Sequence, residues 1–216
     1  MDIRPKGSSA SIERAIEQAL TRLAPPGLGI GCRQIQAGDE QHILPGERAS
    51  IATRDRRTRA ATGAGRRVAH ELLRRLGCKD LAVLRGELGE PVWPAGIVGS
   101  IAHDDEIAVA VAARSEAVRS VGVDIEPASP LPDELRAMVA APQDRLGDLD
   151  AKLGGRILFA VKEAAYKASF PLDGRVLGFE DIAIDFESGE AVTCSGRRLT
   201  VRFTTSPRIL ALAYTA

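Results

Sequence analysis

Residues Val121–Glu126 alternate apolar and acidic side chains, and this pattern limits the fold of the chain more than any other. A repeat of two residues predicts a β-strand in which the apolar side chains face a core, while Asp124 and Glu126 share the opposite face. Pro127 follows directly and should end the strand. The two carboxylates are therefore expected near the carboxyl end of a core strand, where the sites of α/β proteins tend to open.

A second charged segment, Phe159–Lys167, has helical spacing that puts Glu163 and Lys167 on one face, one turn apart. By itself such a pair would be a surface ion pair that contributes about 0.3–0.5 kcal/mol. The helix is rather apolar for a solvated one, however, and Lys162 adds a second cation. Three carboxylates that converge from a strand and a helix would make an all-oxygen site for Mg²⁺, and a lysine beside it suggests a phosphate-bearing substrate.

The composition is balanced, with 29 lysines and arginines against 29 aspartates and glutamates, so net charge favours neither nucleic acid nor membrane binding. Locally, eight arginines from Arg54 to Arg75 outnumber two acids. The three cysteines are far apart and lack a CxxC pattern, so free thiols in a reducing compartment are expected. The first residues lack a secretory signal, and no stretch approaches the roughly 20 apolar residues of a membrane span. We therefore expect a cytoplasmic protein.

The predicted elements follow a similar order in the two halves of the chain. Each half offers a long helix and several strands, which predicts an α+β fold of two pseudo-symmetric lobes, each a small, mainly antiparallel sheet packed on a long helix. The lobes would be residues 1–116 and 117–216. Residues 89–96 are rich in turn formers and should form a loop. Helices are expected over 11–23, 45–76 (kinked or broken at Gly63 and Gly65), 133–140 and 151–169, and strands over 29–35, 81–84, 97–101, 106–113, 119–125, 180–186, 190–194, 198–204 and 209–214.

A third motif lies upstream of the acidic strand and consists of Trp93–Gly96 followed by Gly99–His103. Together the three segments resemble the signatures of the 4′-phosphopantetheinyl transferases, which read W-P-x-G with G-S-(I/L)-(S/T)-H, (V/I)-G-(V/I)-D-(I/V)-E and F-x-x-K-E-A-x-Y-K. The resemblance covers roughly residues 57–185, with the motifs in the family's order. It points to the larger, two-lobed enterobactin-type branch of the family.

This resemblance implies an enzyme that moves the phosphopantetheine arm of coenzyme A onto a serine of an apo acyl or peptidyl carrier protein and releases adenosine 3′,5′-bisphosphate. Asp124, Glu126 and Glu163 would hold Mg²⁺ on the pyrophosphate. Glu163 and Lys167 would be the catalytic residues. Glu163 would take the serine proton, directly or through a water, and Lys167 would neutralise phosphate oxygens.

The resemblance also implies which residues bind coenzyme A. His103 would contact the ribose 3′-phosphate, and Arg66 matches the second of two arginines with which the family holds that group. The first could be Arg57 or Arg59, because Thr58 occupies one possible register. The acidic-aromatic pair that usually lies between the two arginines is also absent here. The residues expected at coenzyme A are Arg59, Arg66, Arg85, Ser100, His103, Lys162 and Lys167.

Two other functions are compatible with the same residues. A metal-dependent phosphohydrolase or nuclease could use the carboxylates with a water nucleophile, although only eight aromatic residues are available for base stacking. A non-catalytic module that binds coenzyme A or a carrier protein should have lost Asp124 or Glu163, and both are present.

For the transferase a monomer is expected, because two lobes in one chain supply the interface that single-lobe relatives obtain by assembling. Residues 127–150, which lie between the two acidic motifs, are expected to recognise the carrier protein. The sequence leaves open which carrier this is and whether it serves siderophore, polyketide, fatty-acid or lipid synthesis.

Overall fold

The computed structural model describes residues 9–48 and 55–215; residues 1–8, 49–54 (Arg54 among them) and 216 lie outside this description. The helices are α1 (Ser9–Leu23), α2 (Pro45–Arg48), α3 (Arg56–Arg75), α4 (Asp133–Val139) and α5 (Gly154–Asp173), with 3-10 turns η1 (Asp39–His42) and η2 (Phe179–Asp181). The strands are β1 (Gly29–Gln34), β2 (Leu84–Arg85), β3 (Pro91–Val92), β4 (Ile97–His103), β5 (Ile107–Arg114), β6 (Ser120–Glu126), β7 (Ile182–Asp185), β8 (Glu190–Thr193), β9 (Arg198–Thr204) and β10 (Ile209–Thr215).

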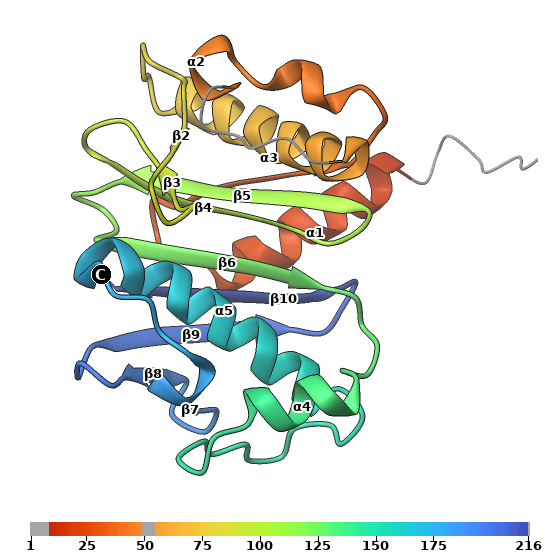
Figure 1. Ribbon diagram of the computed structural model, residues 1–216, viewed down its shortest axis with the longest axis vertical. Coiled ribbons are helices and arrows are strands. Elements are labelled where there is room, and N and C mark those ends of the chain that lie inside the picture. Colours follow the sequence, from red (N-terminus) through yellow and green to blue (C-terminus); the bar gives the residue numbers. More distant parts are fainter. Residues whose placement is uncertain (1–8, 49–54, 216) are drawn as a thin grey trace, which may run out of the picture.

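Apart from the small β2–β3 hairpin, the strands form two antiparallel sheets, each with a long helix against it (Figure 1). The N-terminal sheet has the strand order β1-β5-β4 and packs on α3, while the C-terminal sheet has the order β6-β10-β9-β8-β7 and packs on α5. The predicted α+β architecture of two sheet-bearing lobes is confirmed. The chain passes from one sheet to the other between β5 and β6, through residues 115–119.

Helix α3 is continuous, so the expected kink or break at Gly63 and Gly65 is wrong. A Cβ atom at Gly63 would lie 2.0 Å from the carbonyl oxygen of Asp39, and one at Gly65 would lie 2.7 Å from Cγ2 of Ile101. The two glycines therefore allow η1 and β4 to approach the helix closely. They serve packing between elements, which a single segment of sequence does not reveal.

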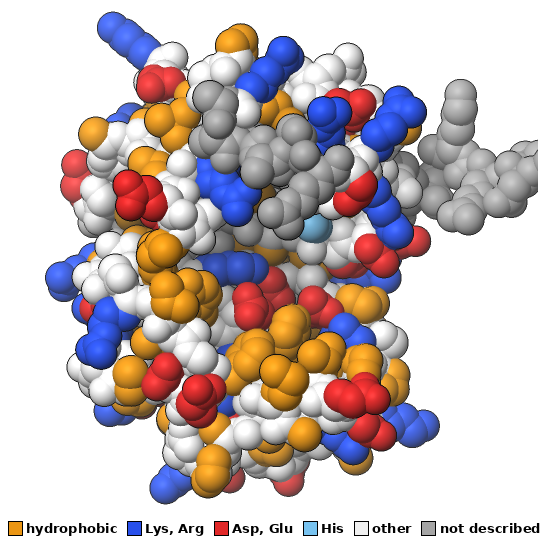
Figure 2. Space-filling model, in the orientation of Figure 1, with side chains coloured by type: hydrophobic (Ala, Val, Ile, Leu, Met, Phe, Trp, Pro, Cys, Tyr) orange, Lys and Arg blue, Asp and Glu red, His pale blue; other side chains and the backbone are white. Residues whose placement is uncertain are grey.

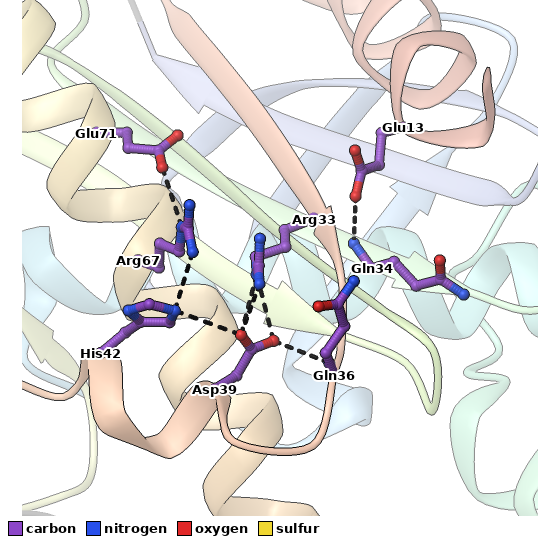
Figure 3. A network of polar contacts seen from close by, with 8 residues as sticks. All are labelled: Glu13, Arg33, Gln34, Gln36, Asp39, His42, Arg67 and Glu71. Carbon is purple, nitrogen blue, oxygen red and sulfur yellow. Dashed lines mark hydrogen bonds and ion pairs between the residues drawn. The ribbon is translucent and has the colours of Figure 1, made fainter. Parts of the chain in front are cut away.

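A buried carboxylate holds η1 in place beside this helix (Figure 3). Asp39 accepts hydrogen bonds from the Arg33 guanidinium at 2.7 Å and from the backbone N–H of Gln36 at 2.8 Å. Arg67 of α3 contacts His42 of η1, with 3.0 Å between Nη1 and Nε2. Burial, followed by the charge of Arg67, lowers the pKa of His42, so the neutral ring can accept that hydrogen bond. The network joins β1, η1 and α3 into one unit.

In the C-terminal lobe the backbone of α5 lies directly on β6. A Cβ atom at Gly122 would lie 2.0 Å from the carbonyl oxygen of Ala164 and 2.7 Å from the backbone nitrogen of Ala168. The hydroxyl of Ser120 donates to the carbonyl of Ala168 and adds a polar link between the two elements. Small residues on both sides thus bring the side chains of α5 within reach of those at the end of β6.

The two lobes share one hydrophobic core. It lies between α1, β5, β6 and β10, and Figure 1 shows α1 behind these strands. The other face of β5 packs against α3, and the other face of β10 packs against α5, so both strands are buried on two sides. Members of the shared core include Ile16, Leu20, Val109, Val111, Val121, Val123, Leu210 and Leu212.

Because this core is shared, we expect the two lobes to unfold in one cooperative transition. Separating them would expose buried Val, Leu and Ile side chains, each of which contributes about 1.5–3 kcal/mol when buried. The chain's single tryptophan, Trp93, reports on the N-terminal lobe, and Tyr166 and Tyr214 report on the C-terminal lobe. Thermal melts followed by tryptophan fluorescence and by near-UV circular dichroism should therefore coincide. Two separate midpoints would contradict a common core.

Smaller differences from the expected elements occur around α2 and the β2–β3 hairpin. The stretch 45–76, expected as one helix, contains both α2 and α3. Of the strand expected over 81–84, only Leu84 lies in a strand, β2, which pairs with β3 inside the stretch expected to be loop. The remaining helices and strands agree with expectation to within a few residues. None of the described helices is both long and apolar enough to cross a bilayer, and the described Cys32, Cys78 and Cys194 are unpaired.

Candidate active site at the junction of the two lobes

The acidic residues of β6 face α5, as their alternation predicts. Val123 and Ile125 point into the shared core, while Asp124 and Glu126 meet cationic side chains of α5. Lys167 Nζ lies 2.6 Å from Asp124 Oδ1 and 3.3 Å from the carbonyl oxygen of Val123. The sequence predicted a lysine beside the acidic residues, and in the structure Lys167 contacts Asp124.

The surroundings of Asp124 disfavour the negative charge of its carboxylate. Only 6% of the residue is exposed. Burial raises the pKa of Asp124, Lys167 opposes this rise through its charge and hydrogen bond, and the carboxylate of Glu163 adds to it. The second oxygen, Oδ2, is buried and has no hydrogen-bond partner among the residues that the structure describes. A buried acceptor without a donor is costly, so this atom is the natural place for a cation to bind.

The raised pKa of Asp124 predicts how stability depends on pH. The pKa of Asp124 is higher in the folded than in the unfolded state, so protonation of this group stabilises the fold. This stabilisation is fully present below pH 3.8, the ordinary pKa of an aspartate, and is lost as the pH rises through the folded-state pKa. Asp124→Asn removes this titration. The free energies of unfolding of the variant and the wild type are measured by urea without divalent metal. The difference, variant minus wild type, should increase between pH 4.5 and 8 by about 1 kcal/mol. A constant difference between the two proteins would contradict the prediction.

Glu126 is held by a residue that the sequence analysis did not identify. Arg156, near the start of α5, places Nη1 2.6 Å from Glu126 Oε2. Burial raises the pKa of Glu126 despite this hydrogen bond, and the charge of Asp124 raises it further. A signal was available, because Arg156 precedes Glu163 by seven residues and so lies on the same helical face two turns earlier.

Glu163 completes the acidic group. It is half-buried, and no hydrogen bond or ion pair joins its carboxylate to any residue within 9–48 or 55–215. Its charge adds to the rise that burial causes in the pKa of Asp124. Yet no set of three or more His, Cys, Asp or Glu side chains in the described chain has the arrangement of a metal centre. One oxygen of Asp124 contacts Lys167 and one oxygen of Glu126 contacts Arg156, so both carboxylates have a cationic partner in this structure.

Two pockets flank the acidic residues. The first, of about 260 Å³, lies between the β2–β3 hairpin, β4 and α5, and Lys167, Tyr166, Phe170, Leu88 and Ile101 are among its lining residues. The second, of about 470 Å³, is lined by charged residues that include His103, Glu126 and Arg156. Figure 2 shows a hollow between the two lobes in which acidic and basic side chains gather, with apolar side chains below it. The junction therefore combines an apolar pocket with a strongly polar one.

Lys162 lies elsewhere than predicted and does not face either pocket. Its side chain is fully buried, at 0% exposure. The ammonium donates to the carbonyls of Val139 and Phe179 and pairs with Asp144 at 2.7 Å. A cation enclosed in this way cannot neutralise the phosphates of a ligand in either pocket, so the expected role of Lys162 in binding coenzyme A is contradicted.

Two further residues expected at coenzyme A have their polar groups turned toward the protein. The Ser100 hydroxyl accepts a hydrogen bond from the Val123 N–H at 3.1 Å, which joins β4 to β6 although Ser100 also lines the apolar pocket. The guanidinium of Arg66 is buried and donates to the carbonyls of Val83 and Leu84. Both residues thus hold the walls of the junction in position.

The remaining predicted cations are accessible. Arg85 is exposed on β2. Burial lowers the pKa of Arg66, and the charge of nearby Arg85 lowers it further. His103 is exposed at the end of β4. Two residues after His103, Asp105 forms an ion pair with Arg57 of α3 at 3.2 Å. Arg59, also on α3, is half-buried. The cations therefore form two groups, one at the hairpin and one at the end of β4.

Comparison with known proteins gives matches over most of the chain. Residues 46–113 match the pattern of the 4′-phosphopantetheinyl transferase N-terminal domain, and residues 120–212 match that of the 4′-phosphopantetheinyl transferase superfamily. The 4′-phosphopantetheinyl transferase PptT of Mycobacterium tuberculosis is 41% identical over 150 residues, which are 67% of this chain and 66% of that protein. The 4′-phosphopantetheinyl transferase Npt of Nocardia iowensis is 41% identical over 145 residues, 66% of this chain and 65% of that protein.

A more distant relative is enterobactin synthase component D of Escherichia coli, which is 39% identical over 114 residues, 49% of this chain and 52% of that protein. The chain thus spans slightly less than two thirds of the length of the first two relatives and about half of the third. Both matched patterns meet at the junction that holds the acidic residues, since the first ends with β5 and the second begins with β6.

Proposed function

The chain belongs to the 4′-phosphopantetheinyl transferase superfamily, and on that premise we propose that it transfers the phosphopantetheine arm of coenzyme A to a serine of an apo carrier protein. The observation that carries this proposal is the contact between buried Asp124 and half-buried Lys167, which lines an apolar pocket, with Glu163 one helical turn before Lys167. A pyrophosphate needs cations and acidic metal ligands close together, and the uncharged pantetheine arm needs a largely apolar channel. The junction offers both.

The donor set fits a magnesium ion. Mg²⁺ is commonly held by one or two carboxylates together with waters and substrate phosphate oxygens, so a complete cage of protein ligands is not needed. Asp124 Oδ2 lacks a donor within the described part of the chain. Burial raises the pKa of Asp124 and that of Glu126; the charge of Glu163 raises the first further, and the charge of Asp124 raises the second. These three residues would hold the ion, and the bound metal would draw negative charge from the phosphoryl group and from the departing bisphosphate.

The transfer itself requires a proton acceptor and a fixed cation. The serine oxygen forms a bond to the β-phosphorus of coenzyme A, and the bond from that phosphorus to the adenosine 3′,5′-bisphosphate breaks. Glu163, half-buried and unpaired among the described residues, would accept the serine proton. Lys167, fixed at 2.6 Å by Asp124, would stabilise charge on the phosphate oxygens.

The nucleotide end of coenzyme A would be bound by the accessible cations. Arg85, His103 and either Arg57 or Arg59 are candidates for the ribose 3′-phosphate and the pyrophosphate. Arg66 and Ser100 would support this site by holding the segments around β2 and β4. Replacing His103 or Arg59 by Ala and measuring the Kd of coenzyme A by calorimetry tests each assignment.

The carrier protein would dock on α4, which follows the acidic strand by a short loop. Leu135 is 42% and Met138 is 65% exposed on this helix, within the segment 127–150. A carrier serine must come close to Glu163, and α4 packs against the same helix α5 that bears this residue. An apolar helical surface next to the acidic site is therefore a suitable platform for the carrier.

Several features of the setting are part of the same proposal. We place the boundary between the lobes at residues 116 and 117, and expect a monomer that acts in the cytoplasm. The shared core supports a monomer, because the two sheets already bury each other's faces. The unpaired cysteines in the described chain are consistent with a reducing compartment.

The test is incubation of the protein with coenzyme A, Mg²⁺ and several different apo acyl and peptidyl carrier proteins. Mass spectrometry should find a carrier that gains one phosphopantetheine group while adenosine 3′,5′-bisphosphate is released. Release of nucleotide without carrier labelling would support a phosphohydrolase instead. Binding of coenzyme A with neither product would support a non-catalytic module.

A further inference from the structure

Helix α4 cannot hold its own position. It has only seven residues, and isolated helices shorter than about 12–15 residues are marginal in water. Val139 at its end and Leu131 before its start are buried against the C-terminal core, whereas Leu135 and Met138 are exposed. The orientation of these two exposed side chains therefore depends on contacts that hold the two ends of the helix.

The end of α4 is held by Lys162 of α5. The ammonium donates to the carbonyl of Val139 at 3.0 Å and to that of Phe179 at 2.9 Å, and lies 2.7 Å from Asp144 Oδ2. All three protons of the ammonium are thereby used. Lys162 is 0% exposed and the side chain of Asp144 is 3% exposed, so the pair is shielded from solvent and salt.

Asp144 extends this contact to the sheet. Its Oδ1 accepts the N–H of Ile184 in β7 at 2.9 Å, and its Oδ2 accepts the N–H of Ala141 at 2.8 Å. The next residue continues the connection, because Arg145 N–H donates to the carbonyl of Ile184 at 2.8 Å. The segment that follows α4 is therefore fixed both to α5 and to the edge of the C-terminal sheet.

The start of α4 is held by the other cation of the same helix. Arg156 donates from Nε to the carbonyl of Ser129 at 3.1 Å and from Nη2 to that of Pro130 at 2.9 Å, while Nη1 binds Glu126. Two side chains of α5, six positions apart, thus hold both ends of α4. The helix is fixed at a set place relative to the acidic residues.

We propose that the buried Lys162–Asp144 pair is a positioning device that presents α4 to the carrier protein, and that Lys162 acts on the carrier and not on coenzyme A. This inference rests on the proposed function. Lys162 adjoins Glu163 in the sequence, but its ammonium is enclosed by Val139, Phe179 and Asp144. A loosened α4 would weaken carrier docking and leave the acidic site intact.

The experiment compares wild type with Lys162→Met/Asp144→Asn, which removes both charges together, because one buried charge left unpaired is strongly destabilising. Met138→Asp, which alters the exposed surface of α4 directly, shows the effect of impaired docking. Arg197→Met/Asp173→Asn is the matched control, since it removes an ion pair that also involves α5 but lies far from α4, at the other end of the helix. Lys162→Gln/Asp144→Asn, which also removes both charges but keeps a hydrogen-bond donor at position 162, is used if the first double variant does not fold.

The expected result is a split between the two substrates. The KM for the apo carrier protein should rise by about tenfold or more in Lys162→Met/Asp144→Asn and in Met138→Asp, and not in the Arg197 control. The Kd of coenzyme A, measured by calorimetry without carrier, should stay within about twofold of wild type, as should kcat at saturating carrier. A weakened Kd for coenzyme A with an unchanged carrier KM would overturn the inference, and so would no change in either.

A readout independent of activity separates this inference from the proposed function. Amide hydrogen exchange should become faster over residues 133–141 and 184 in the Lys162 variant and remain unchanged in the control. If the wild type labels no carrier but these amides exchange faster in the Lys162 variant, the proposed function fails and the positioning of α4 stands. If the amides do not respond, the inference fails whatever the activity.

Discussion

Replacing Glu163 by Gln is expected to lower kcat for carrier labelling by about 10²–10⁴-fold, the usual contribution of a positioned general base. The amide keeps the shape of the side chain but cannot accept the serine proton. Within the described chain Glu163 has no hydrogen-bond or ion-pair partner, so the substitution breaks no such contact and the fold should persist. The rate is measured by mass spectrometry at saturating coenzyme A and carrier, and circular dichroism verifies folding.

The metal concentration separates the two roles of Glu163. If it served only as a ligand of Mg²⁺, raising the concentration of the metal would restore the rate of the variant. If it accepts the proton, the rate remains low when the metal saturates. Glu116→Gln makes the same chemical change at an exposed turn before β6, at the other end of that strand from Asp124 and Glu126, and should leave kcat unaltered. Full activity of Glu163→Gln would remove this residue from the mechanism.

Much of the junction could be predicted because it depends on local periodicity. Alternation along β6 was sufficient to put Asp124 and Glu126 on one face and the valines of the strand in the core. Helical spacing was sufficient to place Glu163 and Lys167 on one face of the helix. Both patterns describe one element at a time. Both were correct because the apolar residues of each element determine which side is buried.

Helical periodicity also explains why the predicted role of Lys162 in binding coenzyme A was wrong. Its position next to Glu163 suggested a shared site, but adjacent residues of a helix do not face the same way. Leu158 and Ala165, four before and three after it, are both buried, so Lys162 belongs to the buried stripe of α5. Arg156 shares the face of Glu163 and was overlooked because it lies outside the recognised motif.

Other features depend on contacts between distant segments and could not be read from the sequence. Asp144 is separated from Lys162 by a helix start and a loop, and nothing local marks the two as partners. Gly63 and Gly65 suggested a break in α3 because glycine disfavours helices. The need for close approach to η1 and β4 appears only when those elements are in place. The same applies to the ion pair of Glu126 with Arg156, which lies two turns before Glu163 on α5.

Gly122→Ala is expected to have the largest effect on stability, because the added methyl group would meet backbone atoms and not a movable side chain. The new Cβ would lie 2.0 Å from the Ala164 carbonyl oxygen and 2.7 Å from the Ala168 nitrogen. Overpacking of this kind costs about 1–3 kcal/mol and occasionally more, and we expect the upper end of that range. Urea unfolding of the variant and of wild type measures the difference.

The same substitution should also impair catalysis, because α5 can relieve the clash only by moving away from β6. That movement would separate Glu163 and Lys167 from Asp124, and a misplacement of about 1 Å can cost about 10²-fold in rate. Gly46→Ala is the matched control, since a Cβ there meets nothing within 4 Å. A Gly122→Ala protein as stable and as active as Gly46→Ala would mean that the close contact between α5 and β6 does not set the geometry of the acidic site.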